Sequence, residues 1–313
     1  MFTVVGEALV DLVQSRENPA DFRAHAGGSP YNVAITLARL GQPVSLVARS
    51  GHDAFGRMLE ARARDSGVSF DRWQTVDEPT SLAVATVDAS GAATYDFYLD
   101  GTAGLGWGDS LVALVPLGGV LHLGSLASWR PPSSAALRAL QRRAYDSGST
   151  LVSYDPNVRP ALIADTDAAR TSVERCISAA HLVKASDEDV TYLYPDLPLD
   201  EVAAKWRTLG AAVVVVTLGS DGAVAFGPDG EVVYQRGETI TVADTVGAGD
   251  SFAGGLLAAL GDLGVHDPSA LHGAGSDQLG VALRQAVTVS AMTCERRGAD
   301  PPTRAEVDAR IGR

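Results

Sequence analysis

The chain has 313 residues, 46% of them hydrophobic and 20% charged. This composition excludes extended disorder, which requires low hydrophobicity and high charge, and the length allows one or two domains. With 25 basic and 38 acidic residues the formal net charge is −13, a balance that repels the phosphates of nucleic acids and anionic membrane surfaces. We therefore expect a globular protein that binds neither nucleic acid nor membranes.

Cysteine usage and the first residues bear on the compartment. Cys176 and Cys294 are the only cysteines and lie far apart in the sequence, which excludes a disulfide framework and a CxxC metal site. The chain starts directly with an apolar run that includes Thr3, without the basic stretch of a secretory signal. The most apolar run, residues 211–216, is too short to cross a bilayer. These features predict a cytoplasmic protein.

In chain order, short β-branched runs alternate with stretches of helical spacing. The runs expected to form strands are residues 2–5, 44–47, 120–123, 151–154, 181–184 and 213–217. The stretches expected to form helices are residues 31–40, 55–65, 134–146 and 202–209. Strands this apolar are typical of a sheet covered on both faces, so the pattern predicts an α/β fold with a mostly parallel central sheet between helices. Residues 261–280 are expected to be a loop between two C-terminal helices.

The region from residue 81 to residue 98 breaks this alternation. It reads as two strands around the turn Asp88-Ala89-Ser90-Gly91, which predicts a hairpin outside the main sheet. Residues 8–13 are a candidate for the same layer. We expect one domain over residues 1–313, with a β-lid built from about 8–25 and 81–104. An edge hairpin of the main sheet is the alternative.

A glycine-punctuated turn at residues 244–249 precedes a helical pattern that begins near Asp250. The first N–H groups of a helix have no intrahelical partner, so such an end can bind an anion, and Gly247 and Gly249 let a phosphate approach the backbone closely. In a kinase, the turn would hold the transferred phosphoryl group while Asp250 accepts the proton of the attacking hydroxyl. The structural alternative is that Asp250 simply favours the first turn of a helix.

Other catalytic motifs are excluded. A dinucleotide fingerprint would need Gly or Ala at Phe252, and no Gly-Lys pair exists for a P-loop. The segment also lacks the last glycine of a GxSxG elbow, and no HExxH motif occurs. Dehydrogenase, Walker NTPase, hydrolase and zinc-enzyme functions are therefore not supported.

A second glycine turn, residues 26–34, also leads into a helix, with Pro30 suited to its first turn. Asn32 follows where the other turn carries an acid. An amide both donates and accepts hydrogen bonds, which suits a polyhydroxylated ligand such as a sugar. The structural alternative is a solvated Asn32 in an ordinary turn.

Together, the two segments resemble the two signature motifs of the ribokinase-like (PfkB) carbohydrate kinase family, in the same order and spacing, and the resemblance extends over essentially the whole chain. It implies a ribokinase-like three-layer α/β/α fold with a small β-sheet lid, and an ATP-dependent sugar kinase. By resemblance, Asp250 is the catalytic base, and the anion hole is formed by Gly247, Ala248 and Gly249. The positions that match sugar-binding residues are Asp11, Gly27, Gly28, Asn32, Phe97 and Arg159.

The resemblance also implies a nucleotide site. Its matching positions are Lys184, Ser186, Thr217, Gly219 and Gly222, with residues 298–299 closing the adenine pocket. Asp244 and the carbonyl of Val246 match a site for a monovalent cation, K⁺, in many members. The family commonly carries Asn-x-x-Glu to place Mg²⁺ and phosphate, whereas this chain has Ser186-Asp187-Glu188-Asp189. Asp189 is expected to orient metal-bound water, with Asp187 or Glu188 as alternatives.

For the substrate, residues 95–103 and 155–159 look most like those of fructokinases, so fructose is expected as the acceptor of the γ-phosphate at a primary hydroxyl. The alternative is 2-keto-3-deoxygluconate, an acid that Arg159 could pair with. A different class of function is a sensor that binds sugar or nucleotide without catalysis, although binding alone does not require a base at Asp250. A homodimer through the lid is implied by resemblance only.

Overall fold

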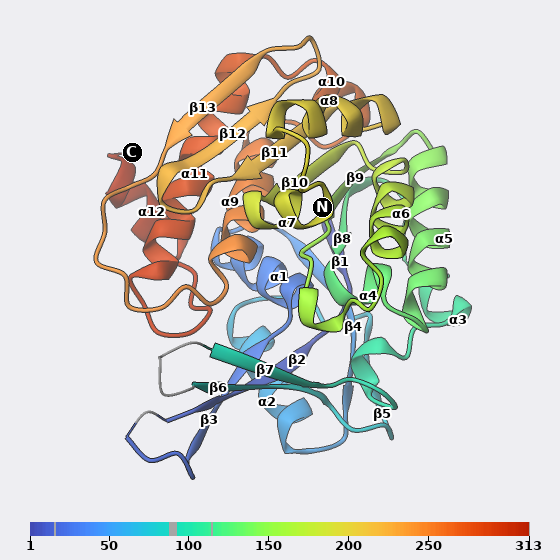
Figure 1. Ribbon diagram of the computed structural model, residues 1–313, viewed down its shortest axis with the longest axis vertical. Helices are drawn as coiled ribbons and strands as arrows, with labels where there is room; N and C mark the ends of the chain where they lie inside the picture. Colours follow the sequence, from blue (N-terminus) through green and yellow to red (C-terminus); the bar gives the residue numbers. More distant parts are fainter. Residues whose placement is uncertain (16, 88–92, 114, 313) are drawn as a thin grey trace.

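The computed structural model describes residues 1–15, 17–87, 93–113 and 115–312. The expected turn Asp88-Ala89-Ser90-Gly91 lies outside the described residues. A large sheet crosses the molecule in the order β13-β12-β11-β10-β9-β8-β1-β4-β5 (Figure 1). Its strands are β1 (Phe2–Val5), β4 (Val44–Gly51), β5 (Trp73–Val76), β8 (Gly119–Gly124), β9 (Thr150–Asp155), β10 (Leu182–Ser186), β11 (Val213–Thr217), β12 (Gly222–Phe226) and β13 (Val232–Arg236).

The sheet is parallel from β5 to β11, and the pairs β11–β12 and β12–β13 are antiparallel. Strand β11 shows why such apolar runs form the centre of a sheet. Val213 and Val215 pack into one hydrophobic core, while Val214 and Val216 pack into a second core on the opposite face. Fully burying a valine side chain contributes about 1.5–3 kcal/mol, so a run of valines is most stable where helices cover both faces.

The helices form a layer on each face, which confirms the predicted three-layer arrangement. One core holds residues of α1 (Ser29–Arg39), α2 (Ala54–Asp65), α9 (Ala248–Asp262), α10 (Pro268–His272), α11 (Ser276–Cys294) and α12 (Arg304–Ile311). The other holds residues of α3 (Asp109–Val112), α4 (Ser125–Trp129), α5 (Ser133–Asp146), α6 (Thr166–Ile177), α7 (Asp187–Leu193) and α8 (Leu199–Leu209). In Figure 1, α5 and α6 lie to the right of the strands, and α11 and α12 to the left.

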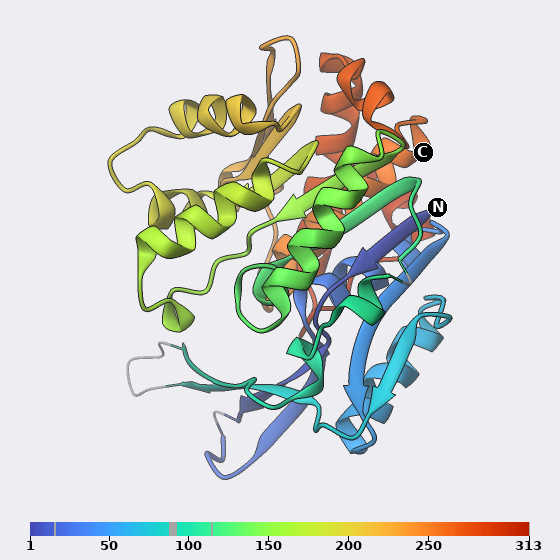
Figure 2. The same cartoon turned by 90° about the vertical axis from the view of Figure 1, so that its right-hand side faces the viewer.

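A second sheet of four strands lies apart from the first, in the order β3-β2-β6-β7. Figure 2 shows it below the large sheet, at the end where several strands of that sheet finish. It consists of β2 (Leu9–Gln14), β3 (Phe22–Gly27), β6 (Ser81–Val87) and β7 (Ala93–Tyr98). The antiparallel pair β6–β7 is the expected hairpin, and β2 joins it by parallel pairing with β6. The alternative of an edge hairpin in the main sheet is therefore wrong.

Two sequence expectations differ from the structure. Residues 261–280, expected to be a loop, contain the short helix α10. Asp267 caps this helix by accepting a hydrogen bond from the Ala270 N–H at 2.9 Å, so a local capping signal outweighed the glycine-rich composition. Strand β4, expected to end at Val47, continues to Gly51 because β5 pairs with its last four residues. Within the described part of the chain, no helix is both long and apolar enough to cross a bilayer.

Candidate active site

A cavity of about 1260 Å³ lies between the carboxyl ends of the parallel strands and the small sheet. Ligands of open α/β sheets bind at this end of the strands, because the loops that follow them meet there. Most of the residues singled out from the sequence line the cavity: Asp11, Gly28, Asn32, Phe97, Arg159, Lys184, Ser186, Asp189, Thr217, Gly219, Gly222, Gly247, Ala248, Gly249 and Asp250. Gly27, Asp244 and the predicted adenine-pocket residues Gly298 and Ala299 are not among its lining residues.

Asp250 lies in the first turn of α9, with Gly247 as the N-cap at φ 76°. A side chain at Gly247 would also meet the Cβ atom of Ala299 at 2.5 Å, so both backbone conformation and space require glycine. The Ala248 N–H donates to the carbonyl of Thr245 at 3.2 Å. The Ala248 amide, expected to be part of the anion hole, is thus engaged by the chain itself. Among the described residues, the N–H groups of Gly249 and Asp250 have no acceptor, so these two amides are available to an anion.

Asn32 joins the two glycine turns. It lies in the first turn of α1, where Pro30 fits the start of the helix as predicted. Its Nδ2 donates to Asp250 Oδ2 at 2.8 Å, across 218 residues of sequence. Its Oδ1 is buried and has no partner in the described part of the chain. A buried acceptor without a partner is unfavourable, and a hydroxyl donor from a ligand in the cavity would satisfy it.

Asp11 reaches the cavity from strand β2 of the small sheet. A Cβ atom at Gly27 would lie 2.2 Å from Asp11 Oδ2, and one at Gly28, which has φ 102°, would lie 2.6 Å from the Glu7 carbonyl. Burial and, to a lesser extent, the charge of Asp250 raise the pKa of Asp11, while Arg159 lowers it, and the pKa is about 7 as a result. Asp11 therefore lies close to a second carboxylate in a site that favours its protonated form.

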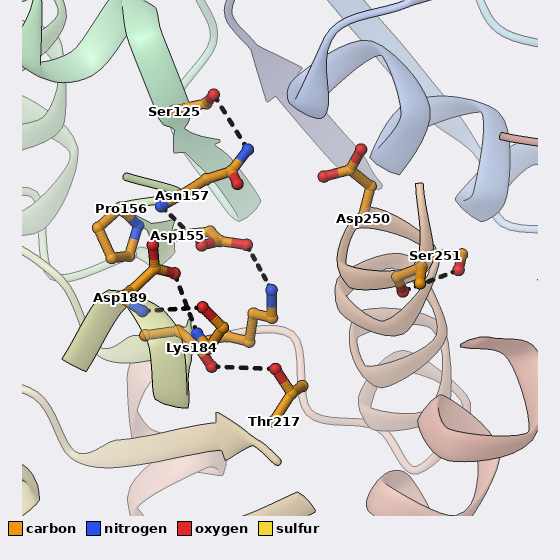
Figure 3. Close-up of polar contacts among 12 residues, drawn as sticks. Ser125, Asp155, Pro156, Asn157, Lys184, Asp189, Thr217, Asp250 and Ser251 are labelled. Carbon is orange, nitrogen blue, oxygen red and sulfur yellow. Dashed lines mark hydrogen bonds and ion pairs between the residues drawn. The ribbon is translucent and has the colours of Figure 1, made fainter. Parts of the chain in front are cut away.

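Lys184 is buried in the middle of β10, with 5% of its surface exposed. Its Nζ donates to Asp155 Oδ2 at 2.9 Å (Figure 3). Burial lowers the pKa of Lys184, but the charge of Asp155 and the hydrogen bond to it outweigh burial, so the pKa is raised overall. The same Nζ lies 3.2 Å from where a Cβ atom at Gly249 would be. A charged ammonium group is thus held against the free amides of α9.

Asp189 is largely engaged by the backbone. Its Oδ1 accepts the Val158 N–H at 2.7 Å, and its Oδ2 accepts the Ser186 N–H at 3.0 Å. The Ser186 hydroxyl accepts the Asp189 N–H in return at 3.0 Å, which completes a capping box at the start of α7. Glu188 is exposed and lines the same cavity, so its carboxylate is the freer of the two.

Arg159 and Phe97 line the cavity from opposite sides, the main sheet and the small sheet. The Arg159 Nη1 donates to Asn157 Oδ1 at 2.7 Å and to the Val158 carbonyl at 3.0 Å. These bonds hold the guanidinium group at the cavity rim and leave its other N–H groups for a ligand.

At the far end of the cavity, the predicted nucleotide residues lie around the ends of β11 and β12. The Thr217 hydroxyl donates to the Ala185 carbonyl at 3.4 Å. Gly222 has φ 106°, and a Cβ atom there would lie 2.0 Å from the Gln235 carbonyl, while Gly219 has φ 55°. Helix α11 adds a wall that the sequence analysis missed, formed by Val287, Ser290, Ala291 and Cys294. Nothing in its helical spacing separates these residues from ordinary core positions.

Glu7 and Ser125 also line the cavity and were missed as site residues. Glu7 follows β1 and is buried, and its Oε2 accepts the Ala127 N–H at 3.2 Å. Burial raises its pKa, while hydrogen bonds from Ser125 and the α4 backbone lower it. The signal that could have found both residues is their place directly after a predicted strand.

Asp244 lies behind the glycine turn. Its Oδ1 accepts the Val246 N–H at 3.1 Å and its Oδ2 accepts the Gly298 N–H at 2.8 Å. It therefore ties the turn before α9 to residues 298–299, where Ala299 meets Gly247. Each oxygen keeps a lone pair that a cation could share.

Comparison with known proteins gives a consistent result. The model of the pfkB family carbohydrate kinases matches residues 1–306. A fructokinase of Rhizobium leguminosarum bv. trifolii is 34% identical over 265 residues, which cover 83% of this chain and 79% of that protein. Fructokinase-1 of Oryza sativa subsp. japonica is 37% identical over 319 residues, covering 96% of this chain and 94% of the rice protein.

Solved structures agree with the sequence relatives. The fructokinase of Xylella fastidiosa with bound ATP superposes with a TM-score of 0.88 at 26% identity, over 100% of this chain and 99% of the other. A double mutant of the Vibrio cholerae O395 fructokinase, bound to fructose, ADP and potassium ion, has a TM-score of 0.84 at 26% identity, over 98% of this chain and 97% of the other.

Proposed function

The chain belongs to the pfkB family of carbohydrate kinases, and we propose that it transfers the γ-phosphate of ATP to a primary hydroxyl of fructose. The observation that carries this proposal is the arrangement at the start of α9: the Asp250 carboxylate, two free amides and the Lys184 ammonium face one cavity. Similarity to proteins named fructokinase supports fructose as the sugar.

In the proposed reaction, Asp250 accepts the proton of the attacking hydroxyl. The hydrogen bond from Asn32 fixes the orientation of this carboxylate. The amides of Gly249 and Asp250, together with Lys184, stabilise the negative charge on the transferred phosphoryl group, and the Gly247 turn lets that group approach. Such transfer depends mainly on positioning and on electrostatic stabilisation, both of which a preformed site supplies.

The sugar end carries groups that can bind the hydroxyls of a neutral ketose. Glu7, Asp11 and Asp250 line it together with Arg159. Burial raises the pKa of Glu7 and of Asp11, so these two side chains favour their neutral forms, which can both donate hydrogen bonds to hydroxyls and accept them. In our proposal Asp11, Gly28 and Asn32 bind hydroxyls, Gly27 leaves room for Asp11, and Phe97 covers the sugar from the small sheet.

ATP binding at the far end involves Ser186, Thr217, Gly219 and Gly222, with Lys184 toward the phosphates. The Xylella fastidiosa fructokinase structure, which holds ATP, supports ATP as the phosphate donor. Within the described residues no group of three or more His, Cys, Asp or Glu side chains could hold a metal ion. Mg²⁺ on nucleotide phosphates needs only one or two protein carboxylates, so the residues fit.

In this proposal Asp189 acts through water, with Glu188 as the freer alternative. Bound Mg²⁺ would neutralise charge on the phosphates. For K⁺ we propose Asp244 and the Val246 carbonyl as ligands. The potassium ion in the Vibrio cholerae structure supports K⁺ as the ion.

We further propose that the chain forms one kinase domain, with the small sheet as a lid that excludes water, a competing nucleophile, once sugar binds. The exposed rings of Phe22, Tyr95 and Tyr98 on this sheet support a homodimer formed through it. The free thiols of Cys176 and Cys294 suit a reducing cytoplasm.

A coupled assay for ADP release tests the function, with fructose, 2-keto-3-deoxygluconate, ribose and a nucleoside as acceptors. We expect fructose to give the highest kcat/KM. Asp250→Asn should lower kcat roughly 10²- to 10⁴-fold, the usual contribution of a general base, without loss of sugar binding. The control is Asp267→Asn, which changes a helix cap far from the cavity. Tight sugar binding without turnover by the wild type would support a sensor.

A further inference from the structure

A chain of hydrogen bonds runs along the floor of the cavity, at the carboxyl ends of three neighbouring strands. Asn157 Nδ2 donates to Ser125 Oγ at 3.2 Å, and the Asn157 N–H donates to Asp155 Oδ1 at 3.1 Å. Asp155 Oδ2 then accepts the bond from Lys184. Ser125, Asn157, Asp155 and Lys184 form this polar chain, which follows strands β8, β9 and β10 in sheet order (Figure 3).

The backbone of the polar chain is unusual at two places. Ser125 has φ 53° and Asn157 has φ 40°, and they are the two non-glycine residues with positive φ in the described part of the chain. Such conformations are uncommon and persist only where neighbouring groups enforce them. The Glu7 carboxylate holds the α4 turn that contains Ser125, and Trp129 Nε1 donates to the Pro156 carbonyl at 3.0 Å. The segment is thus fixed from both sides.

The polar chain holds two cationic side chains. Lys184 lies at one end, against the turn of α9, and Arg159 is bound at the other end through Asn157 Oδ1. A lysine side chain has many rotamers, and burial disfavours its charge. Asp155, with 1% of its surface exposed, is the partner that keeps Lys184 both charged and directed to the turn. Asp155 itself is absent from the described lining of the cavity, so it does not contact a substrate directly. It reaches the cavity through Lys184 and, by the bond from the Asn157 N–H, through the segment that holds Arg159.

We propose that Asp155 and Asn157 are positioning residues: Asp155 holds the Lys184 ammonium group against the phosphate-binding turn, and Asn157 fixes both Asp155 and Arg159. This proposal rests on the kinase function proposed above. The charged groups that face Lys184 are Asp155 from β9, Asp189 from α7 and Asp250 from α9, and the ring of His122 approaches from β8.

The test is Asp155→Asn, which keeps the shape and removes the charge. We expect kcat to fall about 10- to 100-fold, as when other partners that orient a charged group are lost, with the KM for sugar changed less than about twofold. Since the charge of Asp155 raises the pKa of Lys184, the alkaline decline of kcat should also move to lower pH. Asp165→Asn, at the exposed cap of α6, is the matched control and should change none of these.

A double-mutant cycle separates positioning from a general structural effect. In the Lys184→Met background, Asp155→Asn should have no further effect on kcat, because in this proposal Asp155 changes kcat through the Lys184 ammonium group, which that background lacks. The double variant also removes both buried charges, so it should fold even if Asp155→Asn alone leaves Lys184 uncompensated and unstable. If Asp155→Asn lowered kcat equally in the wild type and in Lys184→Met, the proposal would be overturned.

Asn157→Gly tests the second part of the proposal, the role of Asn157 in the polar chain. Glycine accepts the positive φ, so the backbone is not strained, but the amide that holds Arg159 is lost. We expect the KM for sugar to rise more than kcat falls. An unchanged KM together with unchanged kcat would contradict the role of Asn157.

Failure of the kinase function would be distinguishable. If the wild type phosphorylates no sugar in the panel, the proposed function is wrong, and the role of Asp155 is then read from ATP affinity by calorimetry. In that case Asp155→Asn should weaken ATP binding as much as Lys184→Met does, and equal affinity of the wild type and Asp155→Asn would overturn the positioning proposal as well.

Discussion

Gly27 lacks a side chain where the carboxylate of Asp11 needs the space. Asp11 and Gly27 lie on the neighbouring strands β2 and β3 but are not paired directly, since Asp11 pairs with His25 and Leu9 pairs with Gly27. The contact is therefore a diagonal one, and it fixes the side of Asp11 from which a sugar can approach. A single methyl group at position 27 would therefore be enough to displace the Asp11 carboxylate.

Gly27→Ala should raise the KM for the sugar about tenfold, equivalent to about 1.4 kcal/mol, because the new methyl group would displace Asp11 Oδ2. The KM for ATP should stay within about twofold, since the change is at the sugar end. Steady-state kinetics with each substrate varied in turn provides the measurement. Gly275→Ala, where a methyl group meets nothing within 4 Å, is the control, and a similar KM in both variants would contradict the role of Gly27.

At the scale of elements, α9 must carry Asp250 into the cavity while it is packed between α1 and α11. Its residues from Ser251 to Gly261 are buried, and two adjacent glycines make the close packing feasible. A Cβ atom at Gly254 would lie 2.6 Å from Thr36 Cβ of α1, and one at Gly255 would lie 3.1 Å from Ala286 Cα of α11. The helix that presents the base is thereby held in position along most of its length.

Gly254→Ala should destabilise the protein by about 1–3 kcal/mol, the usual cost of overpacking, although alanine is the better helix former by about 1 kcal/mol. Urea unfolding followed by circular dichroism measures the change. The matched control is Gly280→Ala in α11, where the nearest atom would be 3.8 Å away. We expect that variant to be as stable as the wild type or more so. Equal stability gains in both would show that α9 is not tightly packed.

For the whole molecule, buried titratable groups make stability depend on pH in opposing directions. Burial and, to a lesser extent, the charge of Lys184 lower the pKa of His122 to about 3. Burial likewise lowers the pKa of His181, to about 4. In the unfolded chain these rings bind protons near pH 6.5, so their contribution to stability is complete above that pH and is lost as the pH falls toward 4. Burial raises the pKa of Asp155 to about 6, so this group instead favours the folded state as the pH falls through 6.

Replacing His122 isolates one of these terms. When the pH is lowered from 7 to 4.5, the wild type should lose about 2–3 kcal/mol more unfolding free energy than His122→Asn does. The loss follows about 1.36 kcal/mol per pH unit, because only the wild type must keep the His122 ring neutral. Urea unfolding of both proteins at the two pH values gives the difference. The same change at the exposed His52 is the control. A pH-independent difference for His122→Asn would show that its ring is not held neutral in the folded protein.

Much of the architecture was predictable because its signals are local. The apolar run of β11 and the helical spacing of α2 and α5 can each be recognised within one short segment. The observed bounds of these elements differ by few residues from the expected ones. Strand β13 was not predicted, although it contains Val232, Val233 and Tyr234. Its side chains alternate between exposed and half-buried positions because it lies at the edge of the sheet. The glycines before α9 and α1 were informative because each turn demands a particular backbone.

Sequence alone therefore determined the class of fold, the family and the residues that carry the proposed chemistry, because strand patterns and tight glycine turns depend on the nearest neighbours in the chain. Only the tertiary structure brought Asn32 to Asp250, joined Asp155 to Lys184 and revealed Ser125 as the partner of Asn157. These contacts depend on the order of strands in the sheet and on which helix lies over which strand end. No spacing within a single segment encodes that order, since burial and charge pairing between distant segments select it.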